Sequence, residues 1–343
     1  MDIATLPDWL WVKNPIYIDF GQQAANSLKF AKIQIWDDTL MLCEGLYVAR
    51  NDYMKADISG FASKLFDLIP NENITTAETY RNLTIKVLVN STETEIYNQL
   101  HTFVFGGKEP ADLFDITDFM IGTTCKWLTE FDRPAIFEGY PFEVRFMKEA
   151  AYDLMFTSYD HFGNQIEAQT YSVAGNGASR NILKTKLITD SGIATTDVKY
   201  FILKSDYNAD LHCDYVSPIF PGGVYLRWVN RLGGIDQYYF FLKDTRKPIK
   251  TTSVPVPQSL DFTNNWNPGV GKVVDKEKST VLTIGAYQVP INDYEVIARI
   301  SQSERVDMYT SDGKWIQVIV NDIDWNIAHE NDYQDIEFSI TTI

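Results

Sequence analysis

The most informative segment of the chain runs from Tyr225 to Phe241 and reads YLRWVNRLGGIDQYYFF. Two runs rich in aromatic and apolar residues flank a short segment that contains two adjacent glycines, Gly233 and Gly234. Such flanks suit a pleated, half-buried strand, and glycine permits the positive φ that tight connections between antiparallel strands need. The pattern therefore predicts a β-hairpin with two aromatic-rich strands.

The aromatic residues of this hairpin also bear on assembly. Successive side chains of a strand point to opposite faces, so Tyr238 and Phe240 share one face while Tyr239 and Phe241 share the other. A strand that is apolar on both faces is either enclosed in its own domain, the usual role of aromatic residues, or covered by a partner. We predict an intersubunit interface formed by aromatic residues of the hairpin and of the N-terminal stretch, namely Trp9, Trp11, Trp228, Tyr238, Tyr239 and Phe240.

Short strand patterns dominate most of the remaining chain. Residues 31–35, 82–89 and 198–204 each combine apolar, β-branched and alternating polar positions. Two successive series of such segments share an order: an opening strand, a second strand that ends at a turn, an irregular crossing, and paired strands. This order predicts a mainly β protein with two β-sandwich domains of the immunoglobulin or fibronectin III type, at residues 1–110 and 111–246.

The C-terminal part follows a different plan. Residues 247–272 are rich in proline, glycine and asparagine, which disfavour regular structure, so we predict a linker there. Residues 273–343 begin with a strand pattern and continue with a helix, for which Asn292 is the expected N-cap and Glu295 its capping partner. Several short strands come next. This order predicts a small α+β module.

Composition and charge exclude several classes of function. The chain has 343 residues, of which 45% are hydrophobic, and a formal net charge of -16, which disfavours direct nucleic-acid binding. Its three cysteines are odd in number and far apart, so they indicate neither a disulfide framework nor a zinc site. No apolar run approaches the roughly 20 residues of a spanning helix, and the first residues lack a secretion signal. We expect synthesis in a cytoplasm without membrane insertion.

A search for chemical motifs finds no catalytic, cofactor or metal site. His212 and Cys213 are adjacent, so on a strand they would point to opposite faces and would not share a metal. Residues 266–273 resemble a phosphate-binding loop, but Trp266 replaces its first glycine and Val273 its Ser or Thr. A carboxylate pair for glycoside hydrolysis stays open, because the sequence does not reveal the separation of such a pair. We predict a protein without enzymatic activity or cofactor.

The hairpin also carries a family resemblance. Its pattern W-x-N-x-x-G-G-x-D-x-Y-x-F, at residues 228–240, resembles a hairpin of structural tail proteins of tailed bacteriophages, particularly those infecting Bacteroidetes. Residues 14–20 (NPIYIDF) are similar to the first strand of that family, and residues 56–59 (ADIS) to a segment before its helical turn. Residues 31–37 resemble its second strand and turn, although Asp38 stands where the family commonly has glycine.

The resemblance implies a virion protein of the tail or baseplate, built of β-sandwich modules and assembled by subunit docking. The implied partners are other copies of the chain and other tail proteins. The resemblance leaves residues 106–140 and 245–275 unmatched. Two alternatives remain open: a carbohydrate-binding or receptor-binding tail module that contacts a host-surface glycan, and a polysaccharide-degrading tail enzyme.

Overall fold

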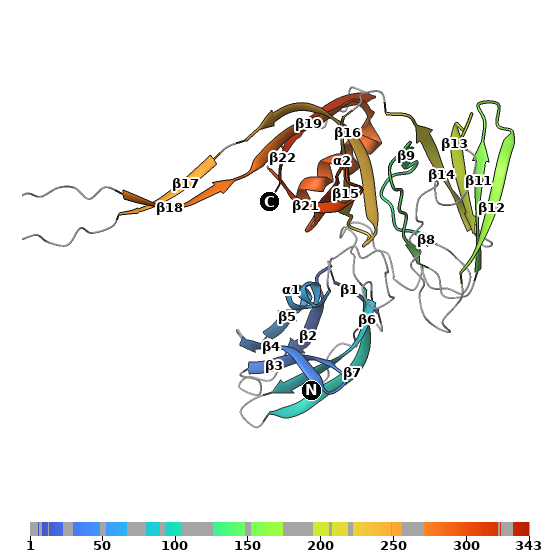
Figure 1. Ribbon diagram of the computed structural model, residues 1–343. Coiled ribbons are helices and arrows are strands. Elements are labelled where there is room, and N and C mark those ends of the chain that lie inside the picture. The colour runs from blue at the N-terminus through green and yellow to red at the C-terminus, as the bar shows by residue number, and fades with distance from the viewer. Residues whose placement is uncertain are drawn as a thin grey trace, which may run out of the picture. The chain divides into compact units, whose positions relative to one another are not determined.

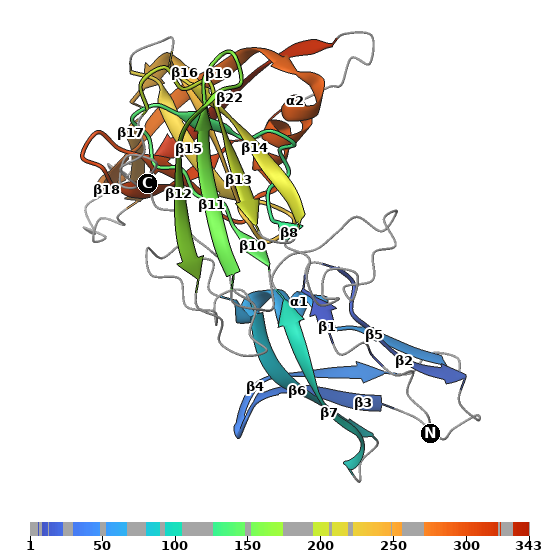
Figure 2. The same ribbon diagram turned by 90° about the vertical axis from the view of Figure 1, so that its right-hand side faces the viewer.

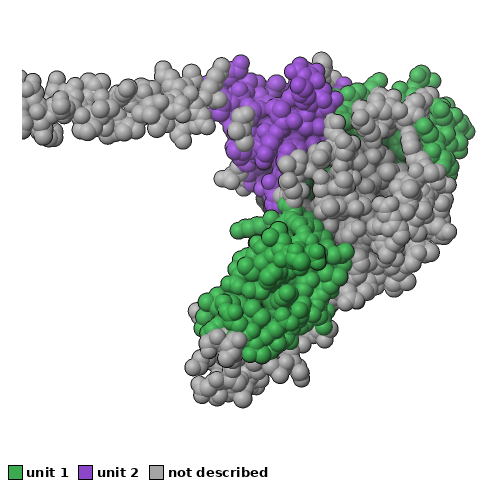
Figure 3. All heavy atoms as spheres, turned by 60° about the horizontal axis from the view of Figure 1, so that its bottom comes forward, with its two compact units in different colours: residues 1–217, 228–237 green, residues 218–227, 238–343 purple. Residues whose placement is uncertain are grey.

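The chain is mainly β, as predicted, with several sheets and short helices (Figure 1). It divides into two compact units: unit 1 comprises residues 1–217 with 228–237, and unit 2 comprises residues 218–227 with 238–343 (Figure 3). In the ranges described, no helix is long and apolar enough to cross a membrane. The computed structural model describes residues 6, 9–12, 14–22, 30–48, 53–66, 80–89, 93–104, 126–147, 152–173, 195–205, 208–218, 222–247, 249–255, 271–321, 323 and 332–342.

The N-terminal part of unit 1 has two sheets on one hydrophobic core. Ile33 and Ile35 of one sheet and Ile18 of the other are buried in that core, because alternate residues of their strands face inward. The five-stranded sheet has the order β1-β7-β6-β3-β4, and the second sheet pairs β2 with β5. The strands are β1 (Trp9–Trp11), β2 (Tyr17–Gln22), β3 (Phe30–Asp37), β4 (Leu40–Val48), β5 (Tyr53–Asp57), β6 (Tyr80–Val89) and β7 (Thr94–Val104).

Two local features explain the turn between β3 and β4 and the chain reversal after β5. Asp38, between β3 and β4, has a φ of 51°, so it adopts the left-handed conformation that glycine favours and aspartate tolerates. Asp57 ends β5, and its Oδ1 accepts hydrogen bonds from Ile16 N (3.1 Å) and Ser59 N (2.9 Å). The short helices α1 (Ser59–Ala62) and η1 (Ser63–Leu65) follow.

A second five-stranded sheet lies in the later part of unit 1, with the order β12-β11-β13-β14-β9 (Figure 2). Phe156 and Phe201 stack in its core with ring centroids 4.9 Å apart, and the Cys213 thiol is buried beside them. The strands are β8 (Lys126–Trp127), β9 (Ala135–Phe137), β10 (Phe146–Met147), β11 (Tyr152–Tyr159), β12 (Gln165–Val173), β13 (Tyr200–Ser205) and β14 (Asn208–Val216), of which β8 and β10 form a small separate sheet.

Unit 2 contains the stem of the predicted hairpin together with the C-terminal strands. Six strands close into a small barrel in the order β15-β16-β19-β22-β21-β20. The hairpin strands thus share a sheet with strands of the segment predicted to be a separate module, whereas residues 228–237 at the hairpin tip belong to unit 1. The strands are β15 (Val224–Val229), β16 (Ile235–Arg246), β19 (Thr280–Pro290), β20 (Val306–Tyr309), β21 (Trp315–Val320) and β22 (Tyr333–Thr342).

One helix accompanies the barrel strands. Helix α2 (Ile291–Ala298) follows β19 directly and continues into η5 (Arg299–Gln302). Pro290 occupies the N-cap position and no side chain caps the helix, so the predicted cap at Asn292 is wrong. Instead, Ile291 N donates a hydrogen bond to Asp332 O (3.0 Å), and the fixed φ of proline suits the start of a helix.

A two-stranded sheet continues from the barrel (Figure 1). It pairs β17 (Ile249–Pro255) with β18 (Gly271–Lys278), and we call it the ribbon. Arg246 pairs with Val281 at the end of β16 and β19, and Ile249 pairs with Lys278 at the start of the ribbon. Two residues separate these pairs on each strand, so the register continues unchanged from the barrel. Residues 249–255 lie in the segment predicted as a linker and form a strand.

Candidate functional site

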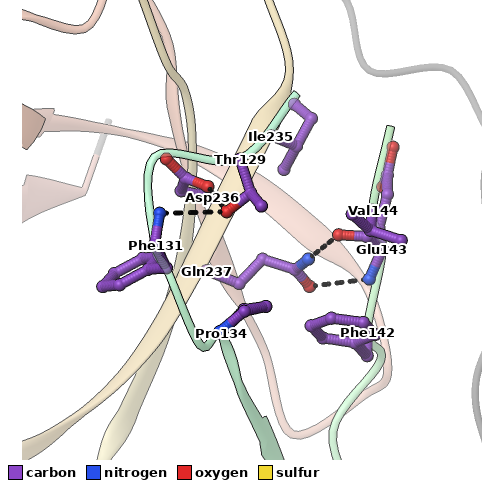
Figure 4. Close-up of a pocket in the computed structure, with 9 residues that line it drawn as sticks. All are labelled: Thr129, Phe131, Pro134, Phe142, Glu143, Val144, Ile235, Asp236 and Gln237. Atoms are coloured by element: carbon purple, nitrogen blue, oxygen red, sulfur yellow. Dashed lines mark hydrogen bonds between the residues drawn. The ribbon is translucent and has the colours of Figure 1, made fainter. Parts of the chain in front are cut away.

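The hairpin tip is the first candidate site because the recognisable motif lies there. Val229 and Ile235 flank the turn and belong to the same hydrophobic core as the N-terminal sheets of unit 1. Residues 228–237 also contact residues 128–145 of unit 1 through a set of buried polar groups (Figure 4). We call this set of contacts the hairpin clamp.

Asn230 organises the turn of the hairpin clamp. Its Oδ1 accepts a hydrogen bond from Gly234 N (2.8 Å), and its Nδ2 donates one to Leu128 O (2.7 Å). Gly233 has a φ of 82°, which favours glycine. A Cβ on Gly234 would lie 1.7 Å from Leu128 O, so only glycine permits this approach of the two backbones. The conformation of the turn and its contacts within unit 1 therefore explain why the motif contains an asparagine and two glycines.

Asp236 is the titratable group of the hairpin clamp. Its carboxylate accepts hydrogen bonds from Thr129 Oγ1 (2.6 Å) and from Glu130 N (3.3 Å to Oδ2). Burial raises the pKa of Asp236 from the ordinary 3.8 to about 7, against the opposing effect of the bond from Thr129. A carboxyl group with such a pKa changes charge near neutral pH.

Gln237 joins the hairpin to a segment with irregular backbone. Its Oε1 accepts a hydrogen bond from Glu143 N (3.2 Å), and its Nε2 donates one to Glu143 O (Figure 4). The side-chain amide thus takes the place of a neighbouring strand beside residues 141–145, which have no regular secondary structure. The buried Glu143 carboxylate pairs with Arg145 at 3.4 Å.

The polar groups of the hairpin clamp have a structural role. The pocket beside Asp236 and Gln237 has a volume of about 10 Å³, which is space for about one water molecule. Among the described residues, no group of three or more His, Cys, Asp or Glu side chains could hold a metal ion. The polar atoms of Asn230, Asp236 and Gln237 already bond to their own chain, so the motif holds two segments of unit 1 together.

Five of the six aromatic residues predicted to form an interface are buried or partly buried in their own chain. Trp11, Trp228, Tyr239 and Phe240 are buried, and Tyr238 is partly buried. Trp9 lies in β1 opposite Thr102, and its side chain is outside the described part. The ring contacts are Trp228 with Phe131 (6.1 Å between centroids), Tyr238 with Phe240 (5.2 Å) and Phe240 with Phe338 (5.2 Å).

This burial bears on the predicted interface. On one face of the stem, Gly223 N donates a hydrogen bond to the Tyr239 hydroxyl (2.7 Å) and Phe241 stacks on Tyr287 at 4.2 Å. On the other face Phe240 packs against Phe338, so unit 2 supplies contacts on both faces of the stem. The rings of Trp228 and Phe240 are accordingly not presented to a partner. Trp9, whose side chain is not described, and the partly buried Tyr238 stay predicted interface residues.

The barrel contains a buried charged group that the sequence did not reveal. Arg227 on β15 pairs with Asp307 on β20 at 3.1 Å, and both side chains are buried. Arg305 also pairs with Asp307 (2.9 Å), and the Arg227 guanidinium lies 4.2 Å from the centroid of the Trp315 ring. Removing Asp307 would leave the buried Arg227 guanidinium without this carboxylate, so the pair stabilises the arrangement of strands that are distant in the sequence.

A second candidate site lies at the end of the later sheet of unit 1, where sequence patterns gave no prediction. A surface pocket of about 460 Å³ is lined there by side chains that include Glu138, Asp197 and Lys199. Tyr159 and Tyr200, at the same end of the sheet, stack in parallel with centroids 5.0 Å apart. The only local signal for this site was the turn after Tyr159, with its Asp, Gly and Asn residues.

The comparisons with known proteins assign no family. No family model matches the chain, and no curated protein matches it. Among solved structures, the crystal structure of native alpha-2-macroglobulin from Escherichia coli, spanning domains MG0-NIE-MG1, aligns with 98% of this chain and 95% of that chain. The sequence identity is 7% and the TM-score is 0.22, so this likeness carries no argument about the fold or the function of the chain.

Proposed function

We propose that the chain is a non-enzymatic structural protein of a phage tail or baseplate, which assembles in the virion by docking to copies of itself and to other tail proteins. In this proposal the two five-stranded sheets of unit 1 belong to two sandwich modules of the immunoglobulin or fibronectin III type. Unit 2 contains the small α+β module, joined by the hairpin stem. The support comes from the motifs of the sequence and from the strand edges described next.

The ribbon is the observation that carries the proposal. The pairing of β19 with β22 ends at Thr280 and Thr342. Beyond that point β17 and β18 pair with each other. In the described part of the chain no third strand joins them. A two-stranded ribbon is marginally stable in water, and both of its outer edges offer unpaired backbone N–H and C=O groups. Such edges are completed when a strand of another subunit adds to them.

The outer edge of β4, which pairs with no further strand in the described part of unit 1, gives a second reason to expect docking. β4 is the last strand of its sheet, and its exposed residues include Leu46 (62% exposed) and Val48 (69% exposed). Leu100, on β7 of the same sheet, is 65% exposed. An edge strand with exposed apolar side chains is a site for strand addition or for burial against a partner.

The distribution of charge favours a copy of the same chain as the partner of the ribbon. Residues 247–278 contain five lysines and three acidic residues, which is a net charge of +2. Since the whole chain carries -16, the remaining residues carry -16 - 2 = -18. Opposite charges steer the association of two surfaces, so the ribbon of one copy is attracted to the acidic remainder of another.

Removal of the ribbon tests the proposal. Because Arg246 and Val281 are paired, Asn-Gly in place of residues 247–280 should close β16 and β19 with a two-residue turn. The wild-type chain should form rings or fibres in electron micrographs and large species in sedimentation. The truncated chain should remain a folded monomer.

A matched variant controls for the loss of chain length. It retains both ribbon strands and replaces only residues 256–270 by Asn-Gly, which joins the paired Pro255 and Gly271. This variant should still assemble. A wild-type chain that stays monomeric at high concentration and is missing from purified virions would overturn the proposal.

A further inference from the structure

The pocket at the end of the later sheet is built from four segments of unit 1. The turn after β11, the residues before β13, and the ends of β14 and β9 surround a volume of about 460 Å³. Pockets of this size accept small organic ligands. The hairpin clamp and the ribbon make no use of these residues, so the pocket is independent of the assembly proposed above.

Backbone hydrogen bonds hold the walls of the pocket in place. Lys199 N donates to Tyr159 O (2.8 Å), and Tyr215 N donates to Lys199 O (3.0 Å). Glu138 N donates to Val216 O (3.0 Å), and the Ser217 hydroxyl donates to Glu138 Oε2 (2.6 Å). The pocket is therefore formed before any ligand binds, which reduces the entropy lost on binding.

A tightly bonded turn borders the pocket. Asp160 Oδ1 accepts hydrogen bonds from Phe162 N and Asn164 N, both at 2.8 Å, and Gly163 has a φ of 82°. The turn places His161 in the lining of the pocket and leaves Phe162 88% exposed. A phenyl ring held in solvent by a fixed backbone is available to a ligand or partner.

Stacked rings stand beside this turn. Tyr159 and Tyr200 are neighbours across β11 and β13, and their rings are 5.0 Å apart with an interplanar angle of 5°. His212 continues the row at 6.3 Å from Tyr200. A Cβ on Gly163 would lie 3.8 Å from the Tyr200 hydroxyl, so the turn and the rings adjoin. His212 and Tyr215 point to opposite faces of β14, so the stacked rings lie on the face opposite Tyr215 and do not line the pocket.

The charges of the pocket restrict the class of ligand. Glu138 and Asp197 supply two negative charges and Lys199 one positive charge, and the chain as a whole is acidic. Anionic ligands are therefore repelled. Carboxylates accept hydrogen bonds from hydroxyl groups, while the ammonium group of Lys199 and the hydroxyl group of Tyr215 can donate them.

We propose that this pocket binds a neutral sugar residue of a glycan chain. The carboxylates of Glu138 and Asp197 bind sugar hydroxyls, and the half-buried Tyr215 ring contacts an apolar face of the sugar. This inference goes beyond the structural role, because the ligand is a carbohydrate and the site consists of residues of unit 1, whereas the ribbon belongs to unit 2.

Titration calorimetry of the full chain tests the inference. The probes are glucose, galactose, mannose and N-acetylglucosamine oligosaccharides, with sulfated and sialylated oligosaccharides as anionic counterparts. At least one neutral probe should bind saturably, and Glu138→Gln and Asp197→Asn should each weaken that binding at least tenfold. Asparagine tolerates the positive φ of 62° at position 197, so that variant keeps the local fold.

Asp210→Asn is the matched control, because it makes the same change of charge on an exposed residue in the first half of β14 and should leave the affinity unchanged. Circular dichroism verifies that every variant is folded. The inference fails if no neutral probe binds, if only anionic probes bind, or if both pocket variants bind as well as the wild type. Sedimentation of the same samples reports assembly separately, so either proposal can fail without the other.

Discussion

The β15–β16 hairpin and the β17–β18 ribbon are both antiparallel pairs, yet they use their polar groups in opposite ways. At the hairpin tip, the side chains of Asn230, Asp236 and Gln237 bond to residues 128–143 of the same unit. In the ribbon, by contrast, the outer backbone edges have no paired strand among the described residues. In this chain the recognisable sequence motif therefore belongs to contacts within unit 1. The groups most available to a partner are backbone N–H and C=O groups at a strand edge, where the sequence has no distinctive motif.

The largest effect should come from Gly234→Ala. The new Cβ would lie 1.7 Å from Leu128 O, and a backbone carbonyl cannot move aside without breaking the hydrogen bond from Asn230. We expect the free energy of unfolding to fall by about 4 kcal/mol, measured by urea denaturation. Gly60→Ala is the control, because no atom lies within 4 Å of its Cβ position and it should change stability by less than about 1 kcal/mol. Equal free energies of unfolding for both variants would show that the backbones at Gly234 and Leu128 are not in close contact.

Asn230→Ala should have the next largest effect. The substitution leaves Gly234 N and Leu128 O without their side-chain partner inside the protein. Each buried polar group left unpaired costs about 1–3 kcal/mol, so we expect a loss of about 3 kcal/mol in the same measurement. Asn230→Asp retains the acceptor and should be less damaging at low pH. A loss under about 1 kcal/mol for the alanine variant would contradict the view that the motif is an internal clamp.

Asp236 gives the hairpin clamp a pH dependence that the ribbon should lack. Its pKa is about 7 in the folded chain and 3.8 ordinarily, so between these values the folded chain retains a proton that the unfolded chain has released. The free energy of unfolding that this group contributes is present below about pH 4 and falls as the pH rises towards 7.

The Asp236→Asn variant measures this contribution. Asparagine does not titrate, so the stability of the wild type relative to Asp236→Asn should fall by about 2 kcal/mol between pH 5 and pH 7. Denaturation curves at both pH values give the difference. A constant difference across this range would mean that Asp236 is ionised in the folded chain at both pH values.

Local patterns in the sequence predicted much of the secondary structure. The alternation of Ile33 and Ile35 identified the buried face of β3, and the glycine pair identified the hairpin turn. Asp38 stands where glycine is common in the family that the sequence resembles, and it adopts the positive φ that glycine favours. Each of these features depends on a few adjacent residues, which is why sequence was sufficient.

The pairing of strands that are distant in the sequence could not be predicted. The pairing of Phe241 with Gly285 joins β16 to β19 across the segment predicted as a linker, and no local pattern specifies that pair. Burial of Trp228 and Phe240 likewise depends on Phe131 and Phe338, which come from distant elements. The aromatic pattern therefore predicted apolar contact correctly, but it did not distinguish a partner in the same chain from a partner in another subunit.

Truncating the ribbon should have the smallest effect on stability. It tests most directly how the ribbon differs from the hairpin clamp. Two strands without a third contribute little stability of their own, and replacing residues 247–280 by Asn-Gly shortens the connection between β16 and β19. Under conditions where both chains are monomeric, urea denaturation should give free energies of unfolding within about 1 kcal/mol of each other. The two regions then differ in kind, because the hairpin clamp holds the monomer together while the ribbon affects only its association. A loss of several kcal/mol on truncation would place the ribbon within the folding unit of the barrel, and its edges would cease to be an argument for assembly.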